Sequence, residues 1–386
     1  QKSRAEIDGK LTSIQSISSF LLDLNSEPKC KKSSVCKMEY FSSEALAKQQ
    51  HDRKILPETE TNGAIIVGAG PSGMAVSACL TSAGVNCVVI EREECLASLW
   101  KHKTYSRLKL HIGKDFCSLP LMSFPKDYPN FVTKDQFLEY LEEYAAKFDI
   151  RPHFCEAVES ANFCQEMEKW RVVARFREDQ SEKIYFGRFL IVATGENSEV
   201  FVPRFEGIES FTGRVLHSKD YKTGMDFRGD DVLVVGCGNS GMEIALDLVN
   251  YEARPSIAIR SRSHVLPREI FGRSTFSVAM YLLKLLPIRI VDNMLILYSN
   301  LTMGDTSSCG ISRPAIGPLE LKNTTGKSPA LDIGAIAKIR SGHIKVFPNI
   351  KRIIDSKIEF EDGEVKDFRT IIFCTGYRSN VLSWLK

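Results

Sequence analysis

Two glycine-rich hexapeptides carry the residue types and spacing that bind a dinucleotide. The first is Gly68-Ala69-Gly70-Pro71-Ser72-Gly73. In such a turn Gly68 allows a tight bend, Gly70 lets the backbone approach a pyrophosphate, and Gly73 lets a helix pack closely on a strand. The N-terminus of the following helix presents free N–H groups and a partial positive charge to the phosphates. The hexapeptide therefore predicts a dinucleotide site, against the alternative of a purely structural glycine turn.

The residues that follow the two hexapeptides suggest different ribose chemistry. Glu91, at the end of the next apolar run, is placed to accept hydrogen bonds from ribose hydroxyls. The second hexapeptide is Gly236-Cys237-Gly238-Asn239-Ser240-Gly241. After it, Arg260 is expected at the position analogous to Glu91, with Arg262 close behind, and guanidinium groups pair with a 2′-phosphate. NADPH is therefore expected at the second site, unless both arginines are ordinary solvated surface charges.

Two nucleotide sites imply an electron path in which NADPH reduces FAD. The 11 cysteines are odd in number and form no Cys-x-x-Cys pair, which argues against a disulfide framework, a metal site and a dithiol redox centre. Oxygen is then the expected electron acceptor. The same cysteine usage favours a reducing, cytoplasmic location.

The elements needed to position these residues recur as two βαβ patterns, each expected to start its own sheet. Their strands and helices are predicted at residues 63–68, 71–83 and 86–90, and again at 232–236, 239–250 and 256–259. Between them, Thr133 and Gln136 have the spacing of a capping box. Short strands are predicted at residues 158–163, 170–176, 183–186 and 189–192, and a hairpin turn at Asp362-Gly363. A last strand at residues 370–373 is expected to rejoin the first sheet.

Length and composition limit the class of protein. A chain of 386 residues suggests two domains, and a net charge of +3 does not suggest a nucleic-acid partner. Residues 1–62 are polar and lack periodicity, which indicates a disordered or non-native extension. Residues 280–301 are apolar, but charged residues and a proline interrupt them, so no transmembrane helix is predicted. That stretch could form a buried helix pair, a wall of the substrate pocket, or a segment resting on a membrane surface.

A third motif carries a resemblance to a known family. Residues 211–221 match the FxGxxxHxxxY signature of flavin-containing monooxygenases through Gly213, His217 and Tyr221. Within that family the sequence most resembles the plant YUCCA enzymes, the indole-3-pyruvate monooxygenases. The matching segments are residues 97–100, 107–111, 193–197, 264–269, 331–334 and 375–377.

The resemblance implies an α/β fold with two Rossmann-like dinucleotide-binding domains, the NADPH domain inserted in the FAD domain. The implied boundaries are residues 63–225 and 330–386 for the FAD domain and 226–329 for the NADPH domain. Residues 193–195 and 374–376 would connect the two domains. The resemblance also assigns Trp100, Thr194 and Gly195 to the FAD site.

The implied reaction is the NADPH- and oxygen-dependent conversion of indole-3-pyruvate to indole-3-acetate through a flavin hydroperoxide, a step of auxin biosynthesis. His111 occupies a place where related enzymes have a polar residue near the flavin, although it could equally be a core hydrogen-bonding residue. His217 and Tyr221 could be catalytic, but with Gly213 they are expected to support the nucleotide sites by holding a nucleotide-facing turn. The alternatives are a flavin monooxygenase acting on sulfur or nitrogen, and a nucleotide-binding protein with little catalysis, because the family normally continues beyond Lys386.

Overall fold

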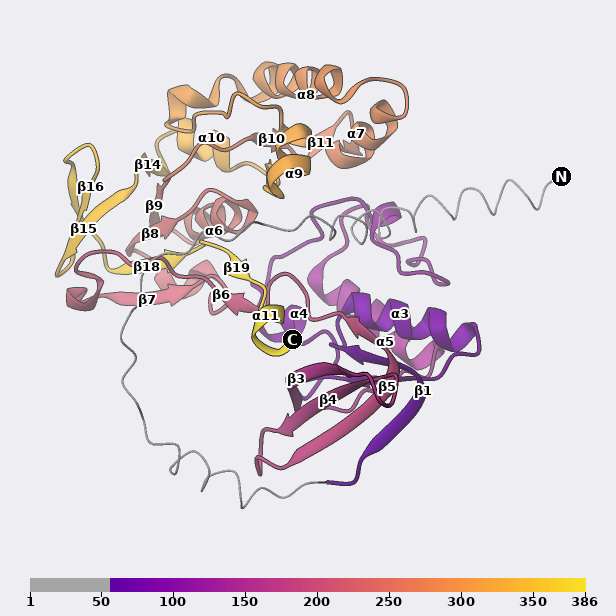
Figure 1. The fold of residues 1–386 in the computed structure, drawn as a ribbon. Coiled ribbons are helices and arrows are strands. Elements are labelled where there is room, and N and C mark those ends of the chain that lie inside the picture. Colours follow the sequence, from indigo (N-terminus) through magenta and orange to yellow (C-terminus); the bar gives the residue numbers. More distant parts are fainter. Residues whose placement is uncertain (1–55) are drawn as a thin grey trace, which may run out of the picture. The chain divides into compact units, whose positions relative to one another are not determined.

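The computed structural model describes residues 56–386, and the first part of this range forms a mixed sheet (Figure 1). Its strands are β1 (Thr59–Val67), β2 (Cys87–Ile90), β3 (Glu156–Cys164), β4 (Lys169–Phe176) and β5 (Glu182–Val192). They lie in the order β2-β1-β5-β4-β3. β1 pairs in parallel with β2 and β5, whereas β4 pairs antiparallel with β5 and β3. The two short strands predicted at 183–186 and 189–192 are thus one continuous strand, β5.

The first βαβ unit forms where the sequence predicted it. Helix α3 (Pro71–Ser82) begins directly after Gly70, with proline at a position whose N–H would have no helical partner. The last five residues of β1 are buried, as expected for a central parallel strand. β1 also begins at Thr59 and not near Gly63, because residues 59–61 pair with residues 185–187 of β5. That part of the expected extension is therefore strand, and residues 1–55 lie outside the described residues.

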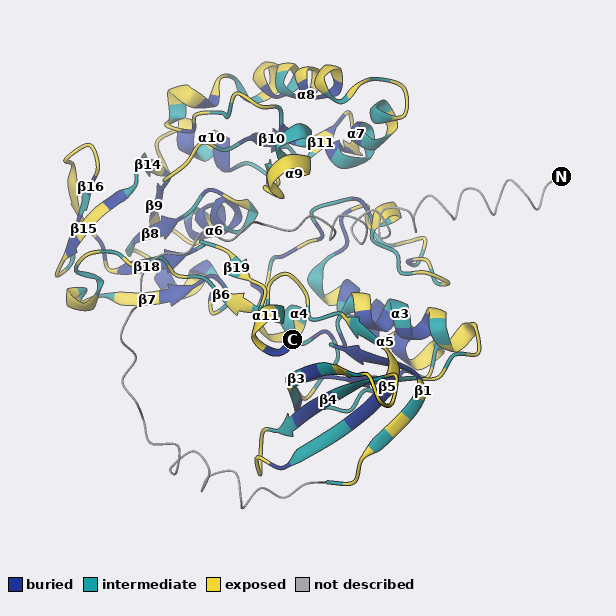
Figure 2. Cartoon of the chain, in the orientation of Figure 1, coloured by how far each residue is buried: buried dark blue, intermediate teal, exposed yellow. Residues whose placement is uncertain are grey.

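Two helices complete the surroundings of the first sheet. Helix α4 (Ser98–His102) is short and carries Trp100. Helix α5 (Lys134–Lys147) begins at the predicted capping box, in which the Thr133 side chain accepts from the Gln136 N–H at 3.3 Å. The Gln136 side chain accepts in return from the Thr133 N–H at 3.2 Å. The buried face of α5 is apolar and aromatic, and Figure 2 shows it alternating with an exposed face.

The second sheet contains only parallel strands. Its strands are β7 (Arg214–His217), β8 (Asp231–Val235), β9 (Arg254–Ala258), β14 (Lys345–Phe347) and β18 (Thr370–Phe373). They lie in the order β14-β9-β8-β18-β7. Helix α6 (Asn239–Asn250) connects β8 to β9 and completes the second predicted βαβ unit.

The expectation that residues 370–373 rejoin the first sheet is wrong. β18 lies between β8 and β7, with Thr370 opposite both Val232 and Arg214. All four of its residues are buried, which suits a central strand. In the first sheet β1 already has β2 and β5 on its two sides, so no place beside it is free. β7, β14 and β18 therefore belong to the second sheet, although the expected boundaries had assigned their residues to the FAD domain.

As predicted, the part of the chain that forms the second sheet is nevertheless inserted between two segments that belong with the first sheet. The chain leaves the first sheet after β5 and returns with helix α11 (Val381–Trp384). Trp384 is buried in the apolar cluster of the first sheet, and Leu385 forms a parallel bridge with Ala161 of β3. The segment that leaves the first sheet contains β6 (Glu199–Val200), and the segment that returns to it contains β19 (Tyr377–Arg378). These two short strands pair antiparallel.

The remaining elements lie around the second sheet. The helices are α7 (Thr275–Leu283), α8 (Ile288–Met303), α9 (Pro318–Thr325) and α10 (Ala335–Arg340). The strands form the pairs β10 (Val265–Pro267) with β13 (Ala330–Asp332) and β11 (Glu269–Ile270) with β12 (Arg273–Ser274), and the hairpins of β15 (Ile350–Ile354), β16 (Lys357–Phe360) and β17 (Val365–Asp367). The turn between β16 and β17 contains Gly363 with φ 85°, as the Asp362-Gly363 pair predicted. No helix within residues 56–386 has the length and apolar character needed to cross a membrane.

Candidate functional site

The first glycine turn has the shape of a phosphate cradle. A Cβ on Gly68 would lie 2.5 Å from the Ala193 carbonyl oxygen, and one on Gly73 would lie 1.9 Å from the Gly68 carbonyl oxygen. These two glycines are therefore required by close packing of backbone on backbone. A Cβ on Gly70, in contrast, would meet no atom within 4 Å. Gly70 faces open space, where a bound pyrophosphate fits.

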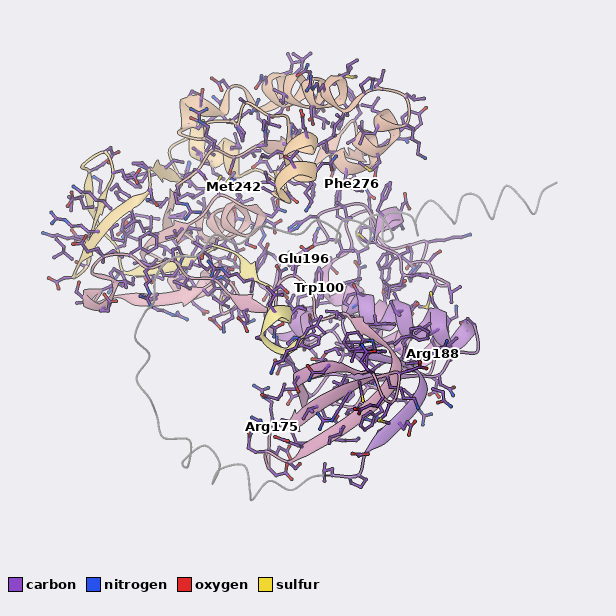
Figure 3. The ribbon with its side chains drawn as sticks, viewed as in Figure 1. Trp100, Arg175, Arg188, Glu196, Met242 and Phe276 are labelled. Atoms are coloured by element: carbon purple, nitrogen blue, oxygen red, sulfur yellow. The ribbon has the colours of Figure 1, made fainter. Side chains whose placement is uncertain are left out.

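The open space next to Gly70 is a cavity of about 410 Å³ between β1, β2, α4 and the connector after β5. The predicted residues that line it are Gly68, Gly70, Pro71, Ser72, Glu91, Trp100, Thr194 and Gly195. Ala69 and Gly73 stand behind this lining, since Ala69 is fully buried and Gly73 packs on the turn. Figure 3 marks Trp100 and Glu196, two residues that belong to this lining.

Glu91 connects the glycine turn to the end of β2. One carboxylate oxygen accepts from the Ala69 N–H at 2.7 Å, and the other accepts from the Glu93 N–H at 3.0 Å. The side chain is buried but still lines the cavity. Glu91 therefore fixes the turn, and the ribose contact that the sequence predicted stays a prediction.

Two unpaired polar atoms show that the cavity suits a polar ligand. Thr194 Oγ1 and Asn380 Oδ1 are buried, and neither has a hydrogen-bond partner within residues 56–386. Both residues line the cavity. Because an unpaired buried polar atom is costly, these two atoms fit a ligand with hydrogen-bonding groups, such as a dinucleotide. Asn380 and Trp384 also line the cavity and come from helix α11 and the residue before it. Sequence reasoning missed both because no local motif marks them.

The second glycine turn repeats the geometry of the first. A Cβ on Gly236 would lie 2.5 Å from the Cys374 carbonyl oxygen, and one on Gly241 would lie 2.0 Å from the Gly236 carbonyl oxygen. A Cβ on Gly238 would again meet nothing within 4 Å. Cys237 lies buried behind the turn, and burial raises the pKa of its thiol to about 12. Gly238 thus offers a second phosphate cradle, at the N-terminus of α6.

The arginines of the second site lie just beyond the strand end. The Gly68 N–H donates to the Ile90 carbonyl oxygen, and the Gly236 N–H donates to the Ala258 carbonyl oxygen, so Ile90 and Ala258 occupy equivalent positions. The residue equivalent to Glu91 is therefore Ile259. The expected equivalence of Glu91 with Arg260 is therefore wrong by one residue. Arg260 and Arg262 are both exposed. A further cation joins them, because Lys327 Nζ donates to the Arg262 carbonyl oxygen at 2.9 Å.

Comparison with known proteins decides the family. Residues 62–382 match the family described as Flavin-binding monooxygenase-like. The chain belongs to this family. It is 54% identical over 326 residues to the indole-3-pyruvate monooxygenase YUCCA6 of Arabidopsis thaliana, covering 84% of this chain and 78% of the relative. It is 50% identical over 329 residues to the indole-3-pyruvate monooxygenase YUCCA1 of Oryza sativa subsp. japonica, covering 85% of this chain and 80% of the relative.

Solved structures share the fold of this flavin-binding monooxygenase-like chain. A flavin-containing monooxygenase from Stenotrophomonas maltophilia has a TM-score of 0.63 at 22% identity, over 85% of this chain and 81% of that one. A complex of OTEMO with FAD and NADP has a TM-score of 0.63 at 19% identity, over 83% and 72%. The predicted fold class and the predicted class of enzyme, a flavin-dependent monooxygenase, are both confirmed.

The three residues of the monooxygenase signature make close contacts beside the second sheet. A Cβ on Gly213 would lie 2.4 Å from the Arg369 carbonyl oxygen. His217 is buried, and its ring packs edge-on against Tyr377 at 5.0 Å between centroids. The buried Tyr221 hydroxyl donates to Asp247 Oδ2 of α6 at 2.7 Å. The contact at Gly213 lies where β7 and β18 begin, whereas the Tyr221 hydroxyl joins the signature segment to α6.

His111 lies outside the lining of the first cavity and beside the second glycine turn. Its Nε2 is 2.9 Å from Glu243 Oε1, and its Nδ1 is 3.4 Å from Asn239 Nδ2. Both ring nitrogens therefore face side chains of α6. Sequence reasoning found His111 and Asn239, but it missed Glu243.

Proposed function

We propose that this chain is an NADPH- and FAD-dependent monooxygenase that converts indole-3-pyruvate to indole-3-acetate. The relatives named above, at 50% and 54% identity, are indole-3-pyruvate monooxygenases, and the match with this chain covers more than two thirds of the length of each. The observation that carries the proposal is the pair of open cradles at Gly70 and Gly238, each at the N-terminus of a helix. One chain with two dinucleotide cradles can bring a hydride donor and a flavin together.

The residues of the chain act mainly by binding and positioning. Gly70, Thr194 and Asn380 would hold FAD in the first cavity, with Glu91 near a ribose. Gly238 would receive the NADPH pyrophosphate, and Arg260 and Arg262 would pair with its 2′-phosphate. Bound FAD would accept the hydride and supply the chemistry that activates oxygen.

The balance of the reaction defines what must be measured. Indole-3-pyruvate, NADPH, a proton and oxygen give indole-3-acetate, carbon dioxide, NADP⁺ and water. One oxygen atom enters the new carboxylate and the other leaves as water, while the bond between the keto carbon and the original carboxylate breaks. The protein must keep bulk water away during this step, because an open site releases hydrogen peroxide.

The test is a coupled assay on purified protein loaded with FAD. We expect NADPH consumption that depends on indole-3-pyruvate, with one indole-3-acetate formed per NADPH and little peroxide. A thioether and a tertiary amine serve as competing substrates. Oxidation of these two substrates without conversion of indole-3-pyruvate would identify a sulfur or nitrogen monooxygenase, and failure to bind FAD would overturn the proposal altogether.

We also propose a cytoplasmic protein that can rest on an anionic membrane surface through α8. One face of this helix exposes apolar side chains at helical spacing: Ile290 at 47%, Met294 at 43%, Leu297 at 59% and Leu301 at 77%. Lys284 just before the helix and Arg289 in its first turn are exposed and basic. Glu320 lies 3.9 Å from Arg289, and the exposed Asp305 follows the helix. Sedimentation with anionic vesicles tests the idea, and Leu297→Glu combined with Leu301→Glu should abolish it; equal binding by that variant would contradict it.

A further inference from the structure

The side chains of Asn239 and Glu243 on helix α6 contact the segment of residues 105–111. This segment follows α4 in the sequence. Asn239 and Glu243 lie one helical turn apart on α6. Glu243 is 3% exposed, and its Oε1 and Oε2 contact His111 Nε2 and the Tyr105 hydroxyl, both at 2.9 Å. A carboxylate buried to this degree is stable only where donors surround it. His111 and Tyr105 supply those donors.

The hydrogen bonds around His111 determine which ring nitrogen carries the proton. The Leu331 backbone N–H can only donate, and it donates to Asn239 Oδ1 at 2.7 Å. The amide of Asn239 is thereby oriented with its NH₂ group toward His111 Nδ1, at 3.4 Å. Nδ1 must then accept, so the proton of the neutral ring resides on Nε2 and is donated to Glu243.

Tyr105 acts as the second donor to the same carboxylate. Its side chain is buried, and burial together with the neighbouring Glu243 raises the pKa of the Tyr105 hydroxyl far above its usual value. The hydroxyl therefore stays protonated and donates to Glu243 Oε2. The Glu243 carboxylate is the acceptor for both groups of the 105–111 segment.

We infer that Glu243 is a positioning residue that, with Asn239, fixes His111 as the neutral Nε2-protonated tautomer and so aligns the 105–111 segment with the NADPH cradle. The inference rests on the proposed function for its kinetic consequence, which is alignment of nicotinamide and flavin for hydride transfer. His111 then acts as a fixed link between the 105–111 segment and helix α6 at the second glycine turn. With both ring nitrogens engaged by α6, it does not act as a proton donor to the reacting groups.

The first test reads the tautomer directly in the apoprotein, without any cofactor. Protein labelled with ¹⁵N at histidine should show the Nε2–H form of His111 by nuclear magnetic resonance. Glu243→Gln keeps an acceptor oxygen for His111 and should retain that tautomer. Glu243→Leu removes the acceptor that holds the Nε2–H, so the ring can turn away from the Asn239 amide and should give a mixture. A wild-type protein with the proton on Nδ1, or a Glu243→Leu variant with an unchanged tautomer, would overturn the inference.

The second test reads alignment in protein loaded with FAD. In anaerobic stopped-flow measurements at saturating NADPH, Glu243→Leu should reduce FAD about tenfold more slowly, because misplaced reactants lose rate steeply. FAD and NADPH dissociation constants should change little, and Glu243→Gln should stay within about threefold of wild type. Glu252→Leu, which removes an exposed carboxylate just beyond α6, is the matched control. Loss of reduction in Glu243→Gln equal to that in Glu243→Leu would overturn the hydrogen-bond role.

The two tests separate this inference from the proposed function. If wild-type protein fails to bind FAD or NADPH, the proposed function is wrong, while the tautomer measured in apoprotein still decides the role of Glu243. Thermal unfolding of each variant shows whether a slow rate reflects misfolding. Tyr105→Phe, which leaves the bond between His111 and Glu243 intact, should keep the wild-type tautomer.

Discussion

At the scale of single residues, Gly70 and Gly73 of the first turn have opposite surroundings. Substitution of Gly70 should weaken FAD binding, and substitution of Gly73 should lower stability. A Cβ at Gly70 meets nothing within 4 Å, and the backbone there has φ −78°, so Gly70→Ala should fold normally. Its methyl group occupies the pyrophosphate space, and we expect the FAD dissociation constant to rise about tenfold, or about 1.4 kcal/mol. Gly73→Ala sets a Cβ 1.9 Å from the Gly68 carbonyl oxygen, which should lower the free energy of unfolding by about 1–3 kcal/mol.

FAD titration and denaturant unfolding of the apoprotein measure these two effects separately. Gly238→Ala and Gly241→Ala form the corresponding pair for NADPH, because their surroundings repeat those of the first turn. The assignment of the first cradle fails if Gly70→Ala binds FAD with wild-type affinity.

Arg260 and Arg262 should determine the choice between NADPH and NADH. Removing both with alanine loses charged hydrogen bonds to the 2′-phosphate, each contributing about 1.5–3 kcal/mol. We expect the NADPH dissociation constant to rise by at least about 100-fold while that of NADH changes little. Equal losses for the two cofactors would mean that the arginines contact the pyrophosphate or support the fold.

At the scale of elements, α6 binds the signature segment through a second buried carboxylate. Asp247 is 5% exposed, and it accepts from the Tyr221 hydroxyl at 2.7 Å and from the Gly224 N–H at 2.9 Å. Arg107 lies 3.4 Å from its other oxygen. Asp247→Ala leaves these donors without an acceptor and should lower the free energy of unfolding by about 3–5 kcal/mol.

Tyr221→Phe is the milder partner of that variant. It removes one hydroxyl group and leaves the carboxylate with its other donors, so a loss of about 1–2 kcal/mol is expected. Urea unfolding of both apoproteins checks the order. A Tyr221→Phe protein with wild-type stability and no turnover would instead assign the tyrosine to catalysis.

Elements whose signals are local could be predicted from the sequence, and those that depend on distant partners could not. The signals for the glycine turns, α3, α6 and the capping box at Thr133 each lie within a short stretch of consecutive residues. The place of β18 depends on which strand edges are free in the folded protein, and an apolar run does not encode that. Likewise, Glu243 and His111 are 132 residues apart in sequence, so neither residue signals its partner.

At the scale of the whole molecule, three buried or half-buried histidines should make the apoprotein sensitive to mild acid. Burial lowers the pKa of His153, His217 and His264 below the usual 6.5. The unfolded chain therefore binds more protons in the window between those lowered values and about pH 6.5. The stabilisation is complete above about pH 6.5 and is lost as the pH falls through the lowered values.

Chemical unfolding at about pH 7 and at about pH 5 measures this loss, and His217→Asn should reduce it. His343, which is exposed, supplies the control substitution His343→Asn. Burial raises the pKa of Asp332, which acts in the opposite direction, so Asp332→Asn should make the acid loss larger. The histidine account fails if His217→Asn and wild type lose the same free energy of unfolding.

The central position of β18 has a consequence for the order of events during synthesis. The first sheet is built from residues 59–192, so all its strands can pair while the rest of the chain is still being translated. β7 and β8, however, are separated by a strand that leaves the ribosome only with residues 370–373. Until then both carry an unpaired inner edge, which is the kind of surface that aggregates or recruits chaperones. Ribosomes stalled before residue 370 should therefore hold a chain whose first sheet resists protease and whose second sheet does not.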